Sequence, residues 1–177
     1  KDPHIWEKSS AIELMIQPGN AGDNKDYYEI QVDVNGAVFD THWDDYNQPI
    51  TGGPEDDKKV FGHMDWSSGL KQGVFVDKAA GNYVVEVAIP WTAFGKARPG
   101  VSLPPQGGES WRLNLYSFKD GQRQALAWSP ILGQGNFHKS ARFGRVTFVA
   151  PTTTSASTTP SAKAAPSAKP VEPKPSH

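Results

Sequence analysis

Carboxylates, amides and a guanidinium recur at alternate positions along three stretches of the sequence. Glu13 lies in the first stretch, Glu29 and Gln31 in the second, and Arg112 and Asn114 in the third. Apolar residues separate them, which is the pattern of a strand with one polar and one apolar face. If the three strands are neighbours, these polar groups converge on one outward side of a sheet. Planar groups that donate and accept hydrogen bonds in pairs are suited to sugar hydroxyl groups.

Aromatic rings accompany this polar set. The chain has six tryptophans among 177 residues, too many for all of them to be core residues. Residues 111–128 read as a β-hairpin whose turn contains Asp120-Gly121, a typical tight-turn pair. Trp128 ends the return strand, and an indole ring can stack on the C–H surface of a sugar. The sequence therefore predicts a binding face at this hairpin.

The elements that must position these residues are short strands joined by turns and loops. Alternation of apolar and polar residues predicts strands over residues 12–16, 27–34, 37–43, 73–77, 83–90, 111–116, 124–128 and 142–149. A single helical turn is expected over residues 91–94, and no helical period of useful length occurs elsewhere. This pattern predicts an all-β fold, an antiparallel β-sandwich of jelly-roll or immunoglobulin-like type.

Composition excludes several classes of protein. The net charge is −1, which gives no electrostatic footprint for nucleic acid. No cysteine is present, so thiol catalysis and Cys-ligated metals are excluded. No apolar run approaches the length that spans a membrane. Residues 1–149 are expected to form one domain, and residues 150–177, rich in Pro, Ala, Ser, Thr and Lys, a disordered tail typical of an extracellular or cell-envelope linker.

The strand motifs resemble a known family. YVVEVAIPW, WRLNLYSF, AWSP and FHKSARFGRVTF, preceded by SSAIELMI and YYEIQVDV, are similar to the family 9 carbohydrate-binding modules and their relatives in the DOMON-like β-sandwich superfamily. The resemblance covers Lys1 to about Val149. It implies a β-sandwich that binds the ends of sugar chains between two tryptophans.

Matching by order in the chain assigns the site that this resemblance implies. The ligand-binding residues would be Trp6, Glu13, Glu29, Gln31, Arg112, Asn114 and Trp128, with the two tryptophans as the clamp. Two positions depart from the family, since Ala125 stands where an amide is usual and Glu29 where a basic residue is expected. The family also has further strands before the position of Lys1, so the sequence resembles a fragment of that domain.

Metal and cofactor sites are not expected from motif spacing. His42, His63 and His138 are dispersed in the sequence without zinc-site spacing. No cofactor is therefore predicted, and a solvated acidic loop is the plainer interpretation of the clustered aspartates. Calcium, in a structural role, is the one ion that the resemblance suggests, with Asp40, Asp44 and Asp45 as candidate ligands.

Three alternatives to sugar binding remain open on the sequence. A haem-binding electron-transfer domain on the same fold would use Met64, His63 or His138 as axial ligands. A glycosidase would use Glu13 and Glu29 as its carboxylate pair. A structural or adhesive envelope domain would pack the same sheet face on a partner.

The sequence favours a non-catalytic module that binds a polysaccharide or oligosaccharide. We expect it to be secreted, periplasmic or in the cell envelope. We also expect a monomer or part of a larger multidomain chain.

Overall fold

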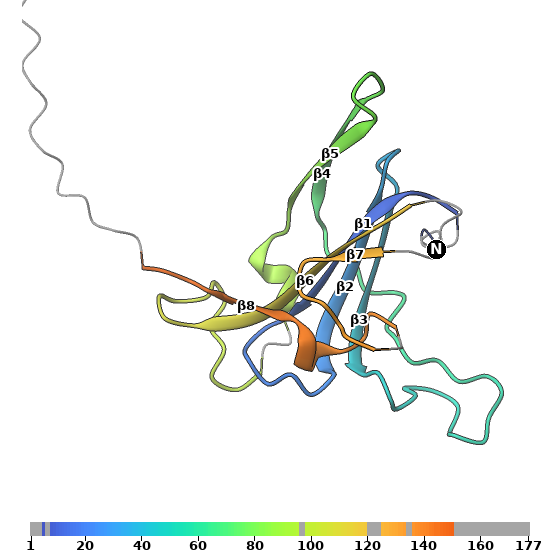
Figure 1. Cartoon of the computed structure of the whole chain (residues 1–177). Helices are drawn as coiled ribbons and strands as arrows, with labels where there is room; N and C mark the ends of the chain where they lie inside the picture. Colours follow the sequence, from blue (N-terminus) through green and yellow to red (C-terminus); the bar gives the residue numbers. More distant parts are fainter. Residues whose placement is uncertain (1–4, 6–7, 96–97, 120–124, 134–135, 151–177) are drawn as a thin grey trace, which may run out of the picture.

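The protein is built almost entirely of antiparallel strands. The computed structural model describes residues 5, 8–95, 98–119, 125–133 and 136–150. The main sheet has the order β3 (Val38–Asp45), β2 (Lys25–Asp33), β1 (Ala11–Gln17), β6 (Ser110–Phe118) and β7 (Ala125–Ala127), and β8 (Gly144–Thr147) also pairs with β6 (Figure 1). A second sheet consists of β4 (Lys71–Asp77) and β5 (Asn82–Ala88). The predicted all-β, sandwich-like class is confirmed, and each expected strand is found with small shifts at its ends.

Strand register determines which side chains share a face of the main sheet. Glu13 of β1 lies opposite Gln31 of β2 and opposite Tyr116 of β6. Because side chains alternate along a strand, these three residues point to the same side. We call this side the polar face. The opposite side, which carries Leu14 and Ile30, is called the apolar face.

The apolar face forms the larger core of the molecule. Leu14, Ile30 and Trp111 are buried there with Phe94, which lies on the short 3-10 helix η2 (Trp91–Phe94). Valines of β4 and β5, Val85 among them, pack against this cluster from the second sheet. Each large side chain buried in this way contributes about 1.5–3 kcal/mol before entropy is subtracted.

The polar face is buried as well, which corrects the expectation that it points outward. Glu13, Gln31 and Asn114 are each at most 2% exposed. The segment after β7, which includes the 3-10 helix η3 (Ser140–Arg142), contributes Phe137 and Phe143 to an aromatic cluster on this face. Strand alternation identified the shared side, but it carried no information about a loop that folds back over it.

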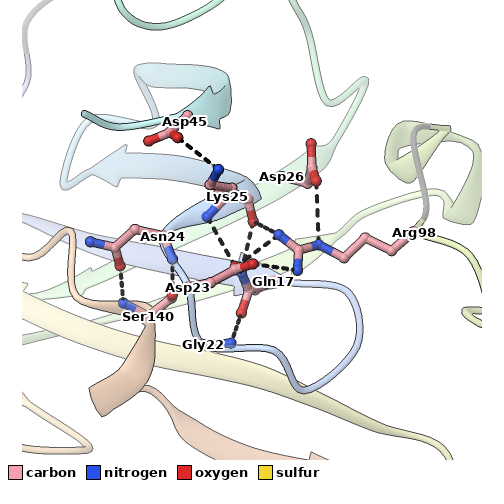
Figure 2. A network of polar contacts seen from close by, with 9 residues as sticks. All are labelled: Gln17, Gly22, Asp23, Asn24, Lys25, Asp26, Asp45, Arg98 and Ser140. Atoms are coloured by element: carbon pink, nitrogen blue, oxygen red, sulfur yellow. Dashed lines mark hydrogen bonds and ion pairs between the residues drawn. The ribbon is translucent and has the colours of Figure 1, made fainter. Parts of the chain in front are cut away.

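The β1–β2 loop holds this cover in place (Figure 2). Asn24 and Ser140 exchange two hydrogen bonds of 2.7 Å, because each backbone N–H donates to the other's side-chain oxygen. The Asn24 amide also donates to the carbonyl of His138 at 2.8 Å. On the other side of the loop, Asp23 accepts two hydrogen bonds of 2.8 Å from Arg98. The loop therefore fixes residues 138–140 against the polar face.

Several predictions concern residues outside those described. Trp6, the Asp120-Gly121 turn and residues 151–177 of the expected disordered tail, which was predicted over residues 150–177, all lie there. The domain boundary near residue 149 stays a prediction. Among the described residues, no helix is long and apolar enough to cross a membrane.

Candidate functional site

A pocket of about 330 Å³ opens between the polar face and the segment that covers it. Residues of β1, β2 and β3 form its floor, and aromatic and polar side chains from the loops form its walls. The lining residues are Glu13, Glu29, Gln31, Phe39, Tyr46, Asn136, Phe137 and His138. We call this cavity the polar pocket. It brings together three of the predicted ligand-binding residues, Glu13, Glu29 and Gln31.

Gln31 connects the two carboxyl groups in the floor of the pocket. Its amide nitrogen donates to Glu13 Oε2 at 2.9 Å and to Glu29 Oε1 at 2.8 Å. The indole N–H of Trp43 donates to the other oxygen of Glu29 at 3.0 Å. Among the described residues, Glu13 Oε1 and Gln31 Oε1 are buried and have no hydrogen-bond partner. A buried polar atom in that state is costly, so the pocket floor has capacity for a polar ligand.

Burial shifts the titration of both acids upward. Removal from water raises the pKa of Glu29 to about 7, although the hydrogen bonds from Trp43 and Gln31 lower it. Burial, followed by the charge of Glu29, raises the pKa of Glu13 well above its usual range, while the hydrogen bond from Gln31 lowers it. Burial therefore favours the protonated form of both acids. A protonated carboxyl group can donate as well as accept a hydrogen bond.

His138 forms a wall of the same pocket, and burial favours the neutral form of its imidazole. Burial lowers the pKa of its imidazole to about 4. Its Nδ1 lies 2.6 Å from the Tyr27 hydroxyl, and its Nε2 lies 3.8 Å from Glu29 Oε2. The second distance is too long for a direct hydrogen bond, and it suits a bridging water or hydroxyl group.

Aromatic rings complete the walls. The Tyr46 ring stacks on His138 with centroids 4.1 Å apart, and the Asn136 amide donates to the Tyr46 hydroxyl at 2.6 Å. Phe137 stacks on Tyr116 with centroids 4.0 Å apart and an angle of 6° between the planes. The pocket thus combines flat apolar surfaces with a polar floor.

Arg112 and Asn114 lie on the polar face but outside the pocket. The Asn114 amide exchanges two hydrogen bonds with the backbone of Ser129, at 2.8 and 2.9 Å. The Arg112 guanidinium donates to the carbonyls of Ser140 and Ala141 at 3.3 and 3.1 Å. Both side chains hold the covering segment in place, and neither is among the residues that line the polar pocket with Glu13.

Trp128 lies on the opposite side of the sheet from the pocket. Its backbone N–H bonds to the carbonyl of Leu115, which shares the apolar face with Leu14. A Cβ atom added to Gly144, whose register partner is Leu113, would collide with the Trp128 ring. The ring is 54% exposed and covers this glycine. Trp128 therefore does not lie over the polar residues, as the predicted tryptophan clamp requires. The other predicted member of the clamp, Trp6, lies outside the described residues.

The three candidate calcium ligands do not come together. Asp40 accepts a hydrogen bond from the Ser68 backbone at 2.6 Å, and Asp45 pairs with Lys25 at 3.2 Å. Asp45 is adjacent in sequence to Asp44 on β3, so the two side chains point to opposite faces. Asp44 is instead 2.7 Å from His63. The three aspartates therefore do not form a shared calcium site.

The candidate haem ligands are also separated. His138 lies over the polar face, whereas His63 stacks on His42, which shares the apolar face with Tyr28. Met64 follows His63 in the chain and is 40% exposed.

Sequence reasoning missed the aromatic members of the site. Tyr27 and Trp43 are register partners, and both share the polar face with Glu29, so strand alternation carried the signal for them. Tyr46, Asn136, Phe137 and His138 come from loops, where residue spacing carries no periodic signal. Only the tertiary fold brings these loops to the pocket.

Comparisons with known proteins bear on the fold. No protein-family model and no curated protein matches the chain. The structure is similar to the crystal structure of a "putative carbohydrate-binding protein" from Bacteroides uniformis, with a TM-score of 0.53 and 21% sequence identity. The match covers 84% of this chain and 64% of the other, so the chain spans less than two thirds of that protein. At this identity the likeness shows a shared fold.

Proposed function

We propose that the protein is a non-catalytic carbohydrate-binding module and that the polar pocket holds one sugar ring at the end of a chain. The observation that carries the proposal is the pair of buried oxygens, Glu13 Oε1 and Gln31 Oε1, which have no partner among the described residues. Both residues line a cavity with aromatic walls. Sugar hydroxyl groups supply the missing hydrogen bonds, because each one can donate and accept.

The size and walls of the cavity support the same ligand class. Its volume of about 330 Å³ is near the lower end of the range for ligand pockets, roughly 300–1,000 Å³. This suits a terminal sugar better than the middle of a long chain. Tyr46 and Phe137 offer ring faces to the C–H surface of the sugar. The fold shared with the Bacteroides uniformis protein, described as a putative carbohydrate-binding protein, supports the same class.

The floor of the pocket favours binding over hydrolysis. A retaining glycosidase needs two carboxyl groups about 5–5.5 Å apart with the scissile bond between them. Here the Gln31 amide lies between Glu13 and Glu29 and bonds to both. The place where a glycosidase positions the bond or a water is thus taken by a protein side chain. The raised pKa values of the two acids follow from burial.

The ligand and the setting are parts of this proposal. A polysaccharide or oligosaccharide is the expected partner, and the module is expected to act outside the cytoplasm. Affinity should be modest, because a few hydrogen bonds made in competition with water gain little net energy.

The proposal is tested by binding rather than by activity. A glycan array identifies a ligand, and isothermal titration calorimetry then compares variants. Gln31→Leu removes the shared donor and one unpartnered acceptor, so we expect binding to be lost. Gln72→Leu is the matched control, because Gln72 lies on β4 and donates to the Gly36 carbonyl, away from the pocket. It should bind as the native protein does.

Two results would contradict the proposal. One is equal sugar affinity in Gln31→Leu and Gln72→Leu, which would place the ligand elsewhere. The other is release of reducing sugar from the same glycan by the native protein and its loss in Glu13→Gln, which would make the site hydrolytic.

A further inference from the structure

A second polar cluster lies on the apolar side of the main sheet, at the end of β3. His42 and Asp44 are two residues apart on β3, so their side chains share a face. His63 comes from the loop that follows and forms an isolated antiparallel bridge with His42. One ligand atom from each of the three residues lies within 4.8 Å of the others. We call these residues the histidine cluster.

The backbone and the surrounding rings fix this geometry. The His63 N–H donates to the His42 carbonyl at 2.8 Å, so the loop is attached to β3 at this point. The two imidazoles are stacked with centroids 5.4 Å apart, and Tyr28 stacks on His42 with centroids 4.7 Å apart. A Cβ at Gly62 would lie 2.9 Å from Thr41 Oγ1, so a glycine lets the loop approach the strand closely.

The nitrogens and the carboxylate face one another. His63 Nε2 lies 2.7 Å from Asp44 Oδ2, and His42 Nδ1 lies 3.5 Å from Asp44 Oδ1. In a tetrahedral zinc site, with bonds of about 2.0–2.2 Å, ligand atoms lie about 3.3 Å apart. A small widening of the His63–Asp44 contact therefore makes room for an ion.

The cluster is accessible from a second cavity. A pocket of about 360 Å³ is lined by His42 and His63 together with Tyr28, Asp65 and Trp66, and by Thr92, Ala93 and Gly95 near η2. His42 is nearly buried, whereas the side chains of His63 and Asp44 are 30% and 39% exposed. An ion can therefore reach the cluster from solvent.

We propose that His42, Asp44 and His63 bind a divalent transition-metal ion of the zinc type. Two imidazole nitrogens and one carboxylate oxygen match the ligand preference of zinc, while calcium takes oxygen ligands. Three protein ligands leave a fourth position for water or for a ligand that enters from the second cavity. The ion would also cross-link β3 to the loop at His63. This site is separate from the polar pocket, so it stands whether or not the protein binds sugar.

The test is a competition titration of the full, tag-free chain with Zn²⁺ against a chromophoric chelator. We expect one Zn²⁺ per chain. Loss of residues around a metal's direct ligands already costs about 10- to 100-fold in affinity, so His63→Ala and Asp44→Asn should each weaken binding more than about 100-fold. Asp45→Asn is the matched control and should bind zinc as the native protein does, because Asp45 points to the opposite face of β3 from Asp44.

A second measurement distinguishes loss of zinc binding from misfolding of a variant. Zn²⁺ should raise the thermal unfolding temperature of the native protein and of Asp45→Asn, because an ion that binds only the folded state stabilises it. It should not raise that of Asp44→Asn. Absence of saturable Zn²⁺ binding would overturn the proposal. Binding of equal affinity in His63→Ala, Asp44→Asn and the native protein would overturn it as well, because it would locate the ion elsewhere, such as at His4 or His177.

Discussion

The two faces of the main sheet are both buried, yet they are buried in different ways. On the apolar face, Leu14 and Ile30 pack against valines of the second sheet and need nothing but close contact. On the polar face, Glu13 and Gln31 are just as inaccessible, but each keeps an oxygen that finds no partner among the described residues. Apolar packing therefore stabilises the first face, and the second is the face on which we propose that a polar ligand binds.

Neighbouring residues on β2 make this difference testable within one strand. Ile30 and Gln31 are adjacent, at 0% and 1% exposed, and they point to opposite faces. The two residues are equally buried, but the proposal gives them different roles, which mutagenesis can separate. The predictions below separate stability from binding at these two faces.

The largest effect on stability is expected from Ile30→Ala. Removal of a fully buried aliphatic side chain leaves a cavity and costs about 3–4 kcal/mol of unfolding free energy. Urea unfolding followed by circular dichroism measures this loss. Where the variant stays folded, sugar affinity should be unchanged. A loss below about 1 kcal/mol would mean that the apolar face is not the main core.

Glu29→Gln should change how stability depends on pH. The folded pKa of about 7 lies above the usual 4.5, so the folded state keeps a proton that the unfolded state loses between these values. The unfolding free energy of the native protein therefore falls as pH rises through this window. In the native protein this fall in unfolding free energy corresponds to about 3 kcal/mol, and Glu29→Gln should not show it.

The measurement is the difference in unfolding free energy between Glu29→Gln and the native protein at pH 4.5 and pH 8. The lowered pKa of His138 acts in the opposite direction, since stability rises with pH between about 4 and 6.5. Both proteins carry this histidine, so its contribution largely cancels in the difference. Parallel pH curves for the two proteins would show that Glu29 is not buried as described.

Gln31→Leu should lower the unfolding free energy less than Ile30→Ala does, but it should lower sugar affinity more. It removes the donor shared by Glu13 and Glu29, and hydrogen bonds to charged groups are worth about 1.5–3 kcal/mol. We expect a loss of about 2 kcal/mol in chemical unfolding and no detectable sugar binding by calorimetry. A fully stable Gln31→Leu variant with native affinity would remove the contrast between the two faces.

The smallest effect is expected from Trp128→Ala. The ring is half-exposed and packs over Gly144 on the apolar side, so its removal should cost about 1 kcal/mol. Sugar affinity should stay at the native level. Loss of binding in a folded Trp128→Ala protein would instead restore this ring as a part of the sugar site.

Strand alternation was enough to predict much of this molecule. The repeat of polar and apolar residues in β2 placed Glu29 and Gln31 on one side, and β1 added Glu13 through its register. Alternation could not show that the side is covered, because the cover comes from a segment with no periodic pattern. The position of Trp128 was predicted from its order in the chain rather than from alternation, and the structure places this ring on the apolar side.

The histidine cluster is a second feature that could not be predicted from patterns in the sequence. His42 and His63 are 21 positions apart and follow no known metal spacing, so residue spacing did not predict that they are neighbours. A single backbone bridge makes them neighbours. Residues that are brought together by one loop contact are visible only in three dimensions.

The most direct test of the central claim uses the indole N–H signals of the protein in a ¹H–¹⁵N correlation spectrum during titration with the sugar found on the array. Trp43 bonds to Glu29 in the floor of the polar pocket, and Trp128 covers Gly144 on the other side of the sheet. The account predicts that the Trp43 signal shifts with added sugar while the Trp128 signal stays in place. A shift of Trp128 with no change at Trp43 would contradict it.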